Sequence, residues 1–424
     1  MQGGAPPKRG IEMKKMLRSH ARLIYETAIK ENMPNSAVEK ALSQKDFGER
    51  VVLVSIGKAG WEMAKTAYEI LGEKIDSGVV ITKYDHAKGP LGNIEIYEAG
   101  HPVVDFNGVC ATKRALEITS SLTEDDTVLF LVSGGGSALF ESVDCSLEKM
   151  QELTKALLKS GATINEMNAI RKHVSNVKGG KLARAVYPAQ VYAIVLSDVV
   201  GNDLSTIASG PATADTTTAE ECMAILDKYG ICLDEEMKSL VKRETPKEIT
   251  NATHVISGSV TNLVKSAENV ARSLGYNTLV IDDGVTCDAA VIAEKIGSLA
   301  EKYENTKTPV AIFFGGEVTI KVKGDGKGGR NQELALLCAE KIKGKSKMAV
   351  FCVGSDGTDG PTDAAGGYVD AFTYGEISKS GKSPEEYLKN NDSYNALALS
   401  NGLIFTGATG TNVNDLYALL IWQE

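Results

Sequence analysis

A series of short, continuous apolar runs constrains the fold of this chain more than any other feature. These runs do not alternate apolar with polar residues, so they predict strands buried on both faces, as in parallel sheets. Segments with helical patterning separate them, and strands alternating with helices predict an α/β fold covered by helices. The expected strands are 51–57, 78–83, 94–100, 128–134, 192–198, 254–259, 277–282, 310–316, 348–357 and 402–407, and the expected helices include 145–160, 180–187, 261–274, 287–304 and 330–343.

The length of 424 residues predicts two or three domains. Segment 231–254 is charged, contains Pro246 and lacks periodicity, which indicates a boundary near 245. We therefore expect one domain over 14–245 and another over 246–424. Residues 1–13 have no apolar core, so they are expected to form a disordered extension and not a signal peptide.

Composition excludes several classes of protein. The net charge of −9 favours neither nucleic acid nor an anionic membrane surface as a partner. No apolar run reaches the length of a membrane span. The seven cysteines are scattered without a CxxC pair, which indicates free thiols and a cytoplasmic location.

Two glycine-rich turns follow predicted strands. Gly57-Lys58-Ala59-Gly60 follows the first strand, and Ser133-Gly134-Gly135-Gly136-Ser137 ends the fourth. Such turns expose backbone N–H groups that suit a phosphate, and a lysine there can set its ammonium beside one. The alternative is a tight turn that needs glycine for its backbone angles, with Lys58 solvated in the first of the two.

Further polar clusters follow in the first half of the chain. Five basic residues surround the Gly179-Gly180 pair, which indicates either an electropositive rim or a cationic surface loop: Arg171, Lys172, His173, Lys178 and Lys181. Asp198 ends a predicted strand, with Asn202 and Asp203 after it. A carboxylate there can hold Mg²⁺ or accept a hydroxyl proton, whereas helix capping explains Asp203 better than Asp198.

The second half carries three candidate clusters. The GxGxxG of 324–329 follows a charged, alternating segment, so we discount it as a dinucleotide fingerprint. Arg330 then begins a predicted helix, where the macrodipole gives a cation no benefit, which favours a ligand contact. Asp356 lies in an acidic loop that suits Mg²⁺–nucleotide or a plain turn, and Thr411 and Asn412 lie in a loop that suits a ligand or a helix cap.

Common catalytic motifs are absent from the sequence. There is no GxxxxGK[ST], no kinase HRD, no GxSxG and no His/Cys cluster with metal-ligand spacing. A phosphoryl-transfer enzyme of this sequence therefore needs an architecture without a P-loop.

Taken in order, the motifs resemble the glycerate 2-kinase family that carries a MOFRL domain, some members of which were formerly labelled hydroxypyruvate reductase. The resemblance covers about residues 17–420. It rests on GKAG (57–60), GHPVVDFNG (100–108), SGGGSAL (133–139), MNAIRKHVSNVKGGKLA (167–183), SDVVGNDLSTIASGP (197–211), GGEVT (315–319), GGRNQELAL (328–336), GSDGTDGPTDAAG (354–366) and TGTNVNDL (409–416).

The resemblance implies a Rossmann-like N-terminal domain, a C-terminal α/β MOFRL domain and an active site in the cleft between them. It implies transfer of the γ-phosphoryl group of ATP to the C2 hydroxyl of D-glycerate, with Mg²⁺ or another divalent cation. The family's active-site lysine and arginine match Lys58 and Arg330. Small molecules are the expected partners, with no nucleic acid and no membrane, and a homo-oligomer stays open.

We expect catalysis by Lys58, Arg330 and Asp198, with Asp198 and Asp356 as metal ligands. Two other functions stay open: an NAD(P)H-dependent hydroxypyruvate reductase and a non-catalytic binder of phosphorylated metabolites. Cations and carboxylates at several strand ends favour chemistry over binding alone. The expected substrate- and nucleotide-binding residues are Gly57, Gly60, Ser133, Gly134, Gly135, Gly136, Ser137, Arg171, Lys178, Asn202, Glu317, Asn331, Asp356, Thr411 and Asn412.

Overall fold

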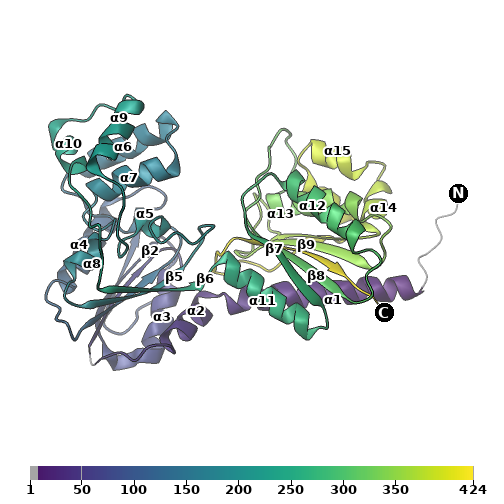
Figure 1. Cartoon of the computed structure of the whole chain (residues 1–424), viewed down its shortest axis with the longest axis horizontal. Coiled ribbons are helices and arrows are strands. Elements are labelled where there is room, and N and C mark those ends of the chain that lie inside the picture. Colours follow the sequence, from purple (N-terminus) through teal and green to yellow (C-terminus); the bar gives the residue numbers. More distant parts are fainter. Residues whose placement is uncertain (1–7, 49, 424) are drawn as a thin grey trace. The chain divides into compact units, whose positions relative to one another are not determined.

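The computed structural model describes residues 8–48 and 50–423, which form two compact units (Figure 1). The first unit comprises residues 34–257. The second unit comprises the described residues up to 33 together with those from 258 onward. Among the described residues no helix is long and apolar enough to cross a membrane.

The first unit is built on a six-stranded sheet with the order β3-β2-β1-β4-β5-β6. Its pairs β1–β2, β2–β3, β1–β4 and β4–β5 are parallel, as the sequence predicts. The strands are β1 (Val51–Ile56), β2 (Ile75–Lys83), β3 (Ile94–Ala99), β4 (Thr127–Val132), β5 (Gln190–Leu196) and β6 (Ala252–Gly258). This is the order of a doubly wound Rossmann-type sheet, which binds ligands beyond the carboxyl ends of its strands.

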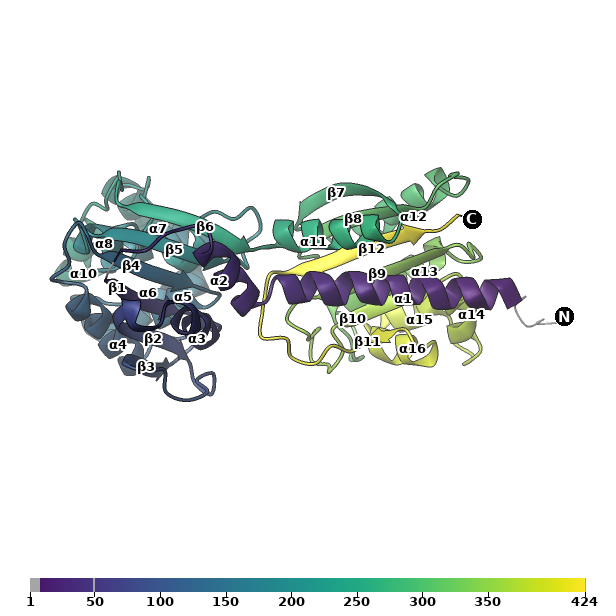
Figure 2. The ribbon, with the colours of Figure 1, turned by 90° about the horizontal axis from the view of Figure 1, so that it is seen from below.

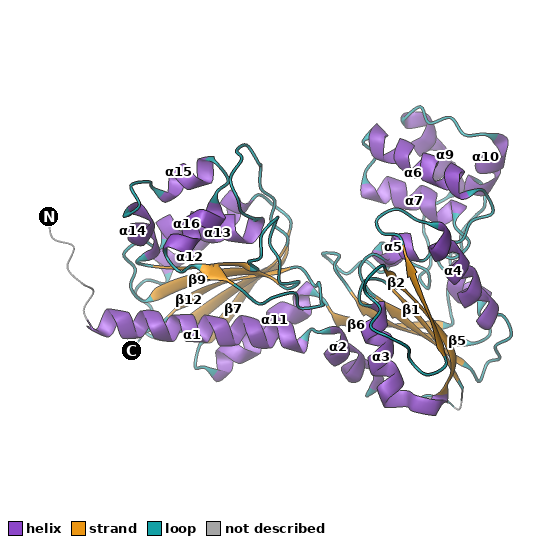
Figure 3. Cartoon of the chain, turned by 180° about the vertical axis from the view of Figure 1, so that it is seen from behind, coloured by secondary structure: helices purple, strands orange, loops and turns teal. Residues whose placement is uncertain are grey.

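Helices cover both faces of this sheet, and a separate helical layer adds to it. Helices α4 and α8 share a core with β1 and β4, whereas α2 and α3 lie on the opposite face (Figure 1). Four further helices, α6, α7, α9 and α10, gather around their own buried cluster (Figure 3). The bounds are α2 (Pro34–Leu42), α3 (Gly60–Leu71), η1 (Gly72–Lys74), α4 (Phe106–Ile118), α5 (Gly136–Leu139), α6 (Leu147–Ser160), α7 (Ile164–Val174), α8 (Lys181–Ala185), η2 (Ile207–Ser209), α9 (Ala219–Lys228) and α10 (Glu235–Val241).

The second unit contains a mixed sheet with the order β11-β10-β9-β12-β8-β7. Among the strand pairs of its described residues, only β7–β8 is parallel; β12 runs antiparallel to both β8 and β9. The parallel arrangement expected from continuous apolar runs is therefore wrong here, because burial on both faces does not fix strand direction. The strands are β7 (Asn277–Val285), β8 (Val310–Gly316), β9 (Met348–Gly354), β10 (Gly366–Asp370), β11 (Leu403–Ile404) and β12 (Asp415–Ile421).

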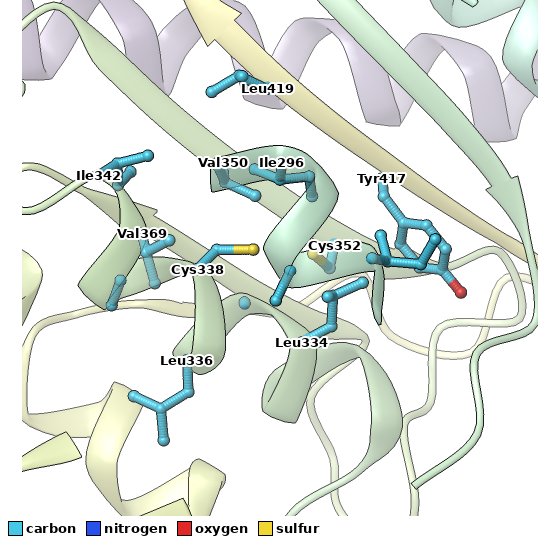
Figure 4. Packing of buried hydrophobic residues seen from close by; sticks show 14 of the residues in the cluster. Ile296, Leu334, Leu336, Cys338, Ile342, Val350, Cys352, Val369, Tyr417 and Leu419 are labelled. Atoms are coloured by element: carbon cyan, nitrogen blue, oxygen red, sulfur yellow. The ribbon is translucent and has the colours of Figure 1, made fainter. Parts of the chain in front are cut away.

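One hydrophobic core of this unit lies between the sheet and helices α12 and α13 (Figure 4). Leu334 and Cys338 of α13 meet Val350 and Cys352 of β9 there, and all four are fully buried. All seven cysteines of the chain are free. The helices of this unit are α1 (Lys8–Glu31), α11 (Val260–Ser273), α12 (Ala289–Lys302), α13 (Arg330–Lys341), α14 (Thr373–Ser378), α15 (Pro384–Lys389) and α16 (Ser393–Leu399).

The division of the chain differs from the expected one at three places. Helix α1 lies along the second sheet (Figure 2), where Tyr25 meets Phe351 edge-on with ring centroids 5.7 Å apart. The first unit also extends to residue 257 and not to 245, because β6 adds a strand to the first sheet. The expected extension over 1–13 differs as well, since α1 begins at Lys8; residues 1–7 lie outside the described residues.

Candidate active site

Two glycine-rich turns meet where the strand order of the first sheet reverses. Beyond β1 lies Gly57–Gly60, and beyond the adjacent β4 lies Ser133–Ser137. The Lys58 N–H donates to the Gly134 carbonyl at 2.9 Å, and the Ala59 N–H donates to Ser133 Oγ at 3.0 Å. The two turns therefore form one braced unit at the topological switch point, the place where folds of this order bind ligands.

The backbone N–H groups of the two turns have different roles. Those of Lys58, Ala59 and Gly60 are all used within the braced unit, the last donating to Gly57 at 2.9 Å. Among the described residues, the N–H groups of Gly134, Gly135 and Ser137 have no hydrogen-bond partner. Successive unpaired N–H groups in a turn make a concave site for an anion. The donors for an anion therefore come from the turn after β4.

Close approach explains why glycine is needed in these turns. Gly57 has a φ of +107°, and a Cβ there would lie 2.7 Å from the Ser133 carbonyl carbon. A Cβ on Gly136 would lie 2.9 Å from Ala208 Cβ, and one on Gly134 would overlap the carboxylate of Asp198. The turn interpretation is thus supported for Gly57 and Gly136 without conflict with anion binding. Ser133 is buried, and its hydroxyl donates to the Ile56 carbonyl at 3.1 Å, which makes it a brace.

Lys58 and a histidine stand beside the unpaired N–H groups. Lys58 is exposed, and its Cγ lies 3.4 Å from the position of a Cβ on Gly135; the ring of His101 lies 3.0 Å from the same position. Burial lowers the pKa of His101, and the charges of Lys58, Lys83 and His86 lower it further. Among the described residues no carboxylate lies within ion-pair distance of the Lys58 ammonium. An anion therefore meets a cation and free N–H donors here.

On the other side of β4, the loop after β5 brings a carboxylate to the same turn. Asp198 follows β5, and its carboxylate lies against Gly134. Asn202 of this loop has a φ of +54°, and its buried Oδ1 has no hydrogen-bond partner in the described part of the chain. Asp203 instead accepts the N–H of Ser205 at 2.9 Å, which makes it a turn residue and not a helix cap, since Thr206 is the N-cap of η2 and η2 has no side-chain cap.

Lys178, in the segment between α7 and α8, forms contacts within the protein. Lys178 is fully buried; its ammonium donates to Glu141 at 2.7 Å and to the Phe140 carbonyl at 2.8 Å. Burial lowers its pKa, although Glu141 opposes that shift. Lys178 is thus a buried ion-pair residue and is not exposed for the substrate contact expected of it. Burial also lowers the pKa of Arg171, which remains a predicted binding residue.

The expected second-unit site centres on Arg330, the first residue of α13. Its Nε donates to Asp415 Oδ2 at 2.6 Å, its Nη2 to Oδ1 at 3.1 Å, and its Nη1 to Glu317. Burial opposes its charge, but Asp415 outweighs burial and raises the pKa of Arg330. Burial raises the pKa of Asp415 to about 6 against the hydrogen bonds from Arg330. The guanidinium is oriented by two carboxylates, and 34% of the Arg330 side chain stays exposed.

The loop before β10 carries two carboxylates that accept backbone N–H groups, and one of them is Asp356, the expected metal ligand. Asp359 of the same acidic loop accepts the N–H groups of Asn331 and Gln332 at 3.1 and 2.8 Å and so caps α13. Asp356 accepts the Thr358 N–H at 3.0 Å, which supports the plain acidic turn. Asn331 keeps a buried Oδ1 with no partner among the described residues.

The glycine-rich and threonine-rich loops of the second unit are also explained by packing. A Cβ on Gly324 would lie 2.6 Å from the Asn390 carbonyl carbon, and one on Gly326 would lie 2.7 Å from Asp392 Cα, so the GxGxxG follows from close backbone approach. Thr411 is buried and donates its hydroxyl to the Asn32 carbonyl at 2.8 Å, so it anchors the end of α1. Asn412 is exposed, and its Oδ1 accepts the Asn414 N–H at 3.3 Å.

Metal binding by this chain would depend on few protein ligands. No group of three or more His, Cys, Asp or Glu residues that could hold a metal occurs within 8–48 and 50–423. Mg²⁺ in nucleotide enzymes uses one or two carboxylates together with phosphate oxygens and water. Asp198, next to the unpaired N–H groups, fits that pattern, whereas Asp356 is engaged by its own turn.

Sequence reasoning missed His101 and Lys83 as site residues. Lys83 is the last residue of β2, and His101 follows β3 by two residues. The rule that selected Asp198, a polar side chain at the carboxyl end of a buried strand, would also have selected both.

Comparison with known proteins extends over the whole chain. Residues 20–242 match a family described as a domain of unknown function, DUF4147, and residues 310–415 match the MOFRL family. The D-glycerate 2-kinase of Thermotoga maritima is 49% identical over 94% of this chain and 97% of its own length. The glycerate 2-kinase of Pyrococcus horikoshii is 38% identical over 88% of both chains.

The crystal structure of the Thermotoga maritima glycerate kinase superposes with a TM-score of 0.93 at 48% identity, over 96% of this chain and 100% of that one. Sequence identity at this level, over nearly the full length of both chains, indicates membership of one family and more than a shared fold. The chain belongs to the glycerate 2-kinase family that carries a MOFRL domain.

Proposed function

We propose that this chain transfers the γ-phosphoryl group of ATP to the C2 hydroxyl of D-glycerate, giving 2-phosphoglycerate and ADP. The observation that carries the proposal is the set of unpaired N–H groups of Gly134, Gly135 and Ser137 beside the Lys58 side chain, at the switch point of a Rossmann-type sheet. The names of the relatives from Thermotoga maritima and Pyrococcus horikoshii support the choice of acceptor.

Phosphoryl transfer requires positioning and charge neutralisation more than covalent chemistry by the protein. Lys58 neutralises phosphate oxygens that the N–H groups of the β4 turn hold in place. Arg330, oriented by Asp415 and Glu317, offers its remaining exposed donors to a phosphate or to the glycerate carboxylate. Glu317 thereby acts through Arg330.

Asp198 is the proposed base for the acceptor hydroxyl. A carboxylate at a strand end beside an anion site is placed to accept the proton of an attacking hydroxyl. Asp198 is equally the residue that would hold Mg²⁺ when metal–nucleotide is bound, and the cation would then neutralise phosphate charge. The orphaned Oδ1 of Asn202 in the same loop supplies an acceptor for a substrate hydroxyl or a bound water.

The test is ATP turnover that depends on D-glycerate. Purified protein with ATP, Mg²⁺ and D-glycerate should release ADP, and omission of D-glycerate should abolish the release. Oxidation of NADH with hydroxypyruvate, in place of ADP release, would refute the proposal and establish a reductase. Ligand-induced stabilisation with neither turnover would establish a non-catalytic binder.

A further inference from the structure

Positive charge is gathered on one side of the switch point of the first sheet. Lys58 follows β1, Lys83 ends β2 and His101 follows β3, whereas Asp198 follows β5 on the other side of β4. His101 faces the β4 turn directly, because its ring lies 3.0 Å from the position of a Cβ on Gly135. The edge thus carries two ammonium groups and an imidazole over β3-β2-β1, and a carboxylate beyond β4.

The nearby acidic side chains are engaged by the loops themselves. Glu98 accepts the N–H groups of His86 and Ala87 at 3.0 and 2.9 Å. Asp105 accepts the Tyr84 hydroxyl at 2.7 Å and the Gly100 N–H at 2.9 Å. Within the described chain, neither Lys58 nor Lys83 has a carboxylate at ion-pair distance. Their charges are therefore available to a ligand.

We propose that Lys83 and His101 extend the Gly134–Ser137 anion site toward β2 and β3, so that this site holds the polyphosphate of the nucleotide and not the carboxylate of D-glycerate. The inference rests on the proposed function and assigns one of its two substrates to this edge. A carboxylate brings a single negative charge, which Lys58 alone would balance. Two ammonium groups and an imidazole that can take up a proton, together with three free N–H donors, match a ligand with several negative charges.

His101 gives this binding a pH dependence. The groups that face it, Lys58, Lys83 and His86, disfavour a further positive charge, as does its burial, so its pKa is lowered in the free protein. A bound polyphosphate reverses the sign of the local field and favours the imidazolium. Nucleotide binding should then take up a proton, and affinity should rise as the pH falls, because the bound state holds the proton more tightly.

ADP is a suitable probe, since it can bind without turnover. Isothermal titration with ADP would compare the wild type with Lys83→Gln, His101→Gln and the control Lys88→Gln. Lys88 lies in the loop after β2, the strand that ends at Lys83, but its ammonium forms an ion pair with Glu62 at 3.2 Å. Loss of one charge-assisted contact should weaken ADP binding about tenfold for K83Q and H101Q, and K88Q should stay near wild type.

Steady-state kinetics separate the two substrates. K83Q and H101Q should raise the KM for ATP about tenfold and leave the KM for D-glycerate nearly unchanged. Titrations in buffers of different ionisation enthalpy should show proton uptake on ADP binding that H101Q reduces. Unchanged ADP affinity, or a raised KM for D-glycerate instead, would overturn the inference. If the wild type shows no D-glycerate phosphorylation while the ADP pattern holds, the proposed function fails and the polyphosphate site stands.

Discussion

Replacement of Gly134 by alanine tests the placement of Asp198. The backbone of Gly134 does not have a positive φ, so alanine brings no conformational penalty of the kind expected at Gly57. The new Cβ would lie 3.2 Å from Asp198 Cγ and overlap the carboxylate oxygen Oδ2. Since carbon–oxygen contacts need about 3.4 Å or more, the carboxylate must retreat by roughly 1 Å.

The expected effect is on turnover more than on folding. A displacement of about 1 Å in a positioned catalytic group costs on the order of 100-fold in rate. We therefore expect kcat to fall about 100-fold in G134A, measured as D-glycerate-dependent ADP release, while the thermal midpoint stays within a few degrees of wild type. D198N should have a similar kcat, because both variants remove a correctly placed carboxylate.

The control is Gly375→Ala in α14, where an added Cβ meets no atom within 4 Å. G375A should keep wild-type kcat. A G134A protein that folds and keeps kcat within threefold of wild type would refute the role of Asp198, since its carboxylate would then have moved without consequence.

Three further predictions concern charges. K58A and R330A should fold and lose at least about 100-fold in kcat, because each variant removes a preorganised positive charge. The control K65A removes only the exposed ion pair with Glu69 and should keep full activity. A near-normal kcat in K58A or R330A would disprove the role assigned to that residue. The pKa of Asp415 is raised from 3.8 to about 6, so the folded state holds this proton more tightly than the unfolded state, and the contribution of Asp415 to stability falls as the pH rises from about 4 to 6. Below about pH 6, protonation of Asp415 should also loosen Arg330 and lower kcat. A pH profile of D415N with the same inflection would contradict this prediction. K178M should destabilise the first unit by about 3–5 kcal/mol in urea unfolding, because it leaves buried Glu141 unpaired, and K228M, at an exposed pair, should have a much smaller effect.

The sequence predicted the first sheet well because its strands are buried on both faces and are joined by helices, so period and connection agree. It failed to predict strand direction in the second sheet, where the expected strands 310–316 and 348–357 both run antiparallel to β12, which was itself not expected as a strand. Strand β10 was missed because Gly366 and Gly367 begin it, and glycine is depleted in strands. Helix α1 could not be assigned to its unit, since an amphipathic pattern does not name the partner of its apolar face.

The sequence predicted which candidate residues lie close together best where they follow the end of a recognisable strand. Lys58, Asp198 and the Gly134–Gly136 turn meet as the strand-end rule indicates. Lys178 and Thr411 were misjudged because a polar side chain gives no sign in the sequence that a buried partner, Glu141 or the Asn32 carbonyl, already engages it. His101 was missed because the strand-end rule that selected Asp198 was not applied to the residues after 94–100.

The position of phosphorylation is the most direct test of the proposed reaction. Purified protein with ATP, Mg²⁺ and D-glycerate should be coupled to enolase alone, without phosphoglycerate mutase, and phosphoenolpyruvate should be followed by its absorbance. We expect phosphoenolpyruvate at the rate of ADP release, since enolase accepts 2-phosphoglycerate. ADP release without phosphoenolpyruvate would contradict transfer to the C2 hydroxyl and point to C3 or to another acceptor.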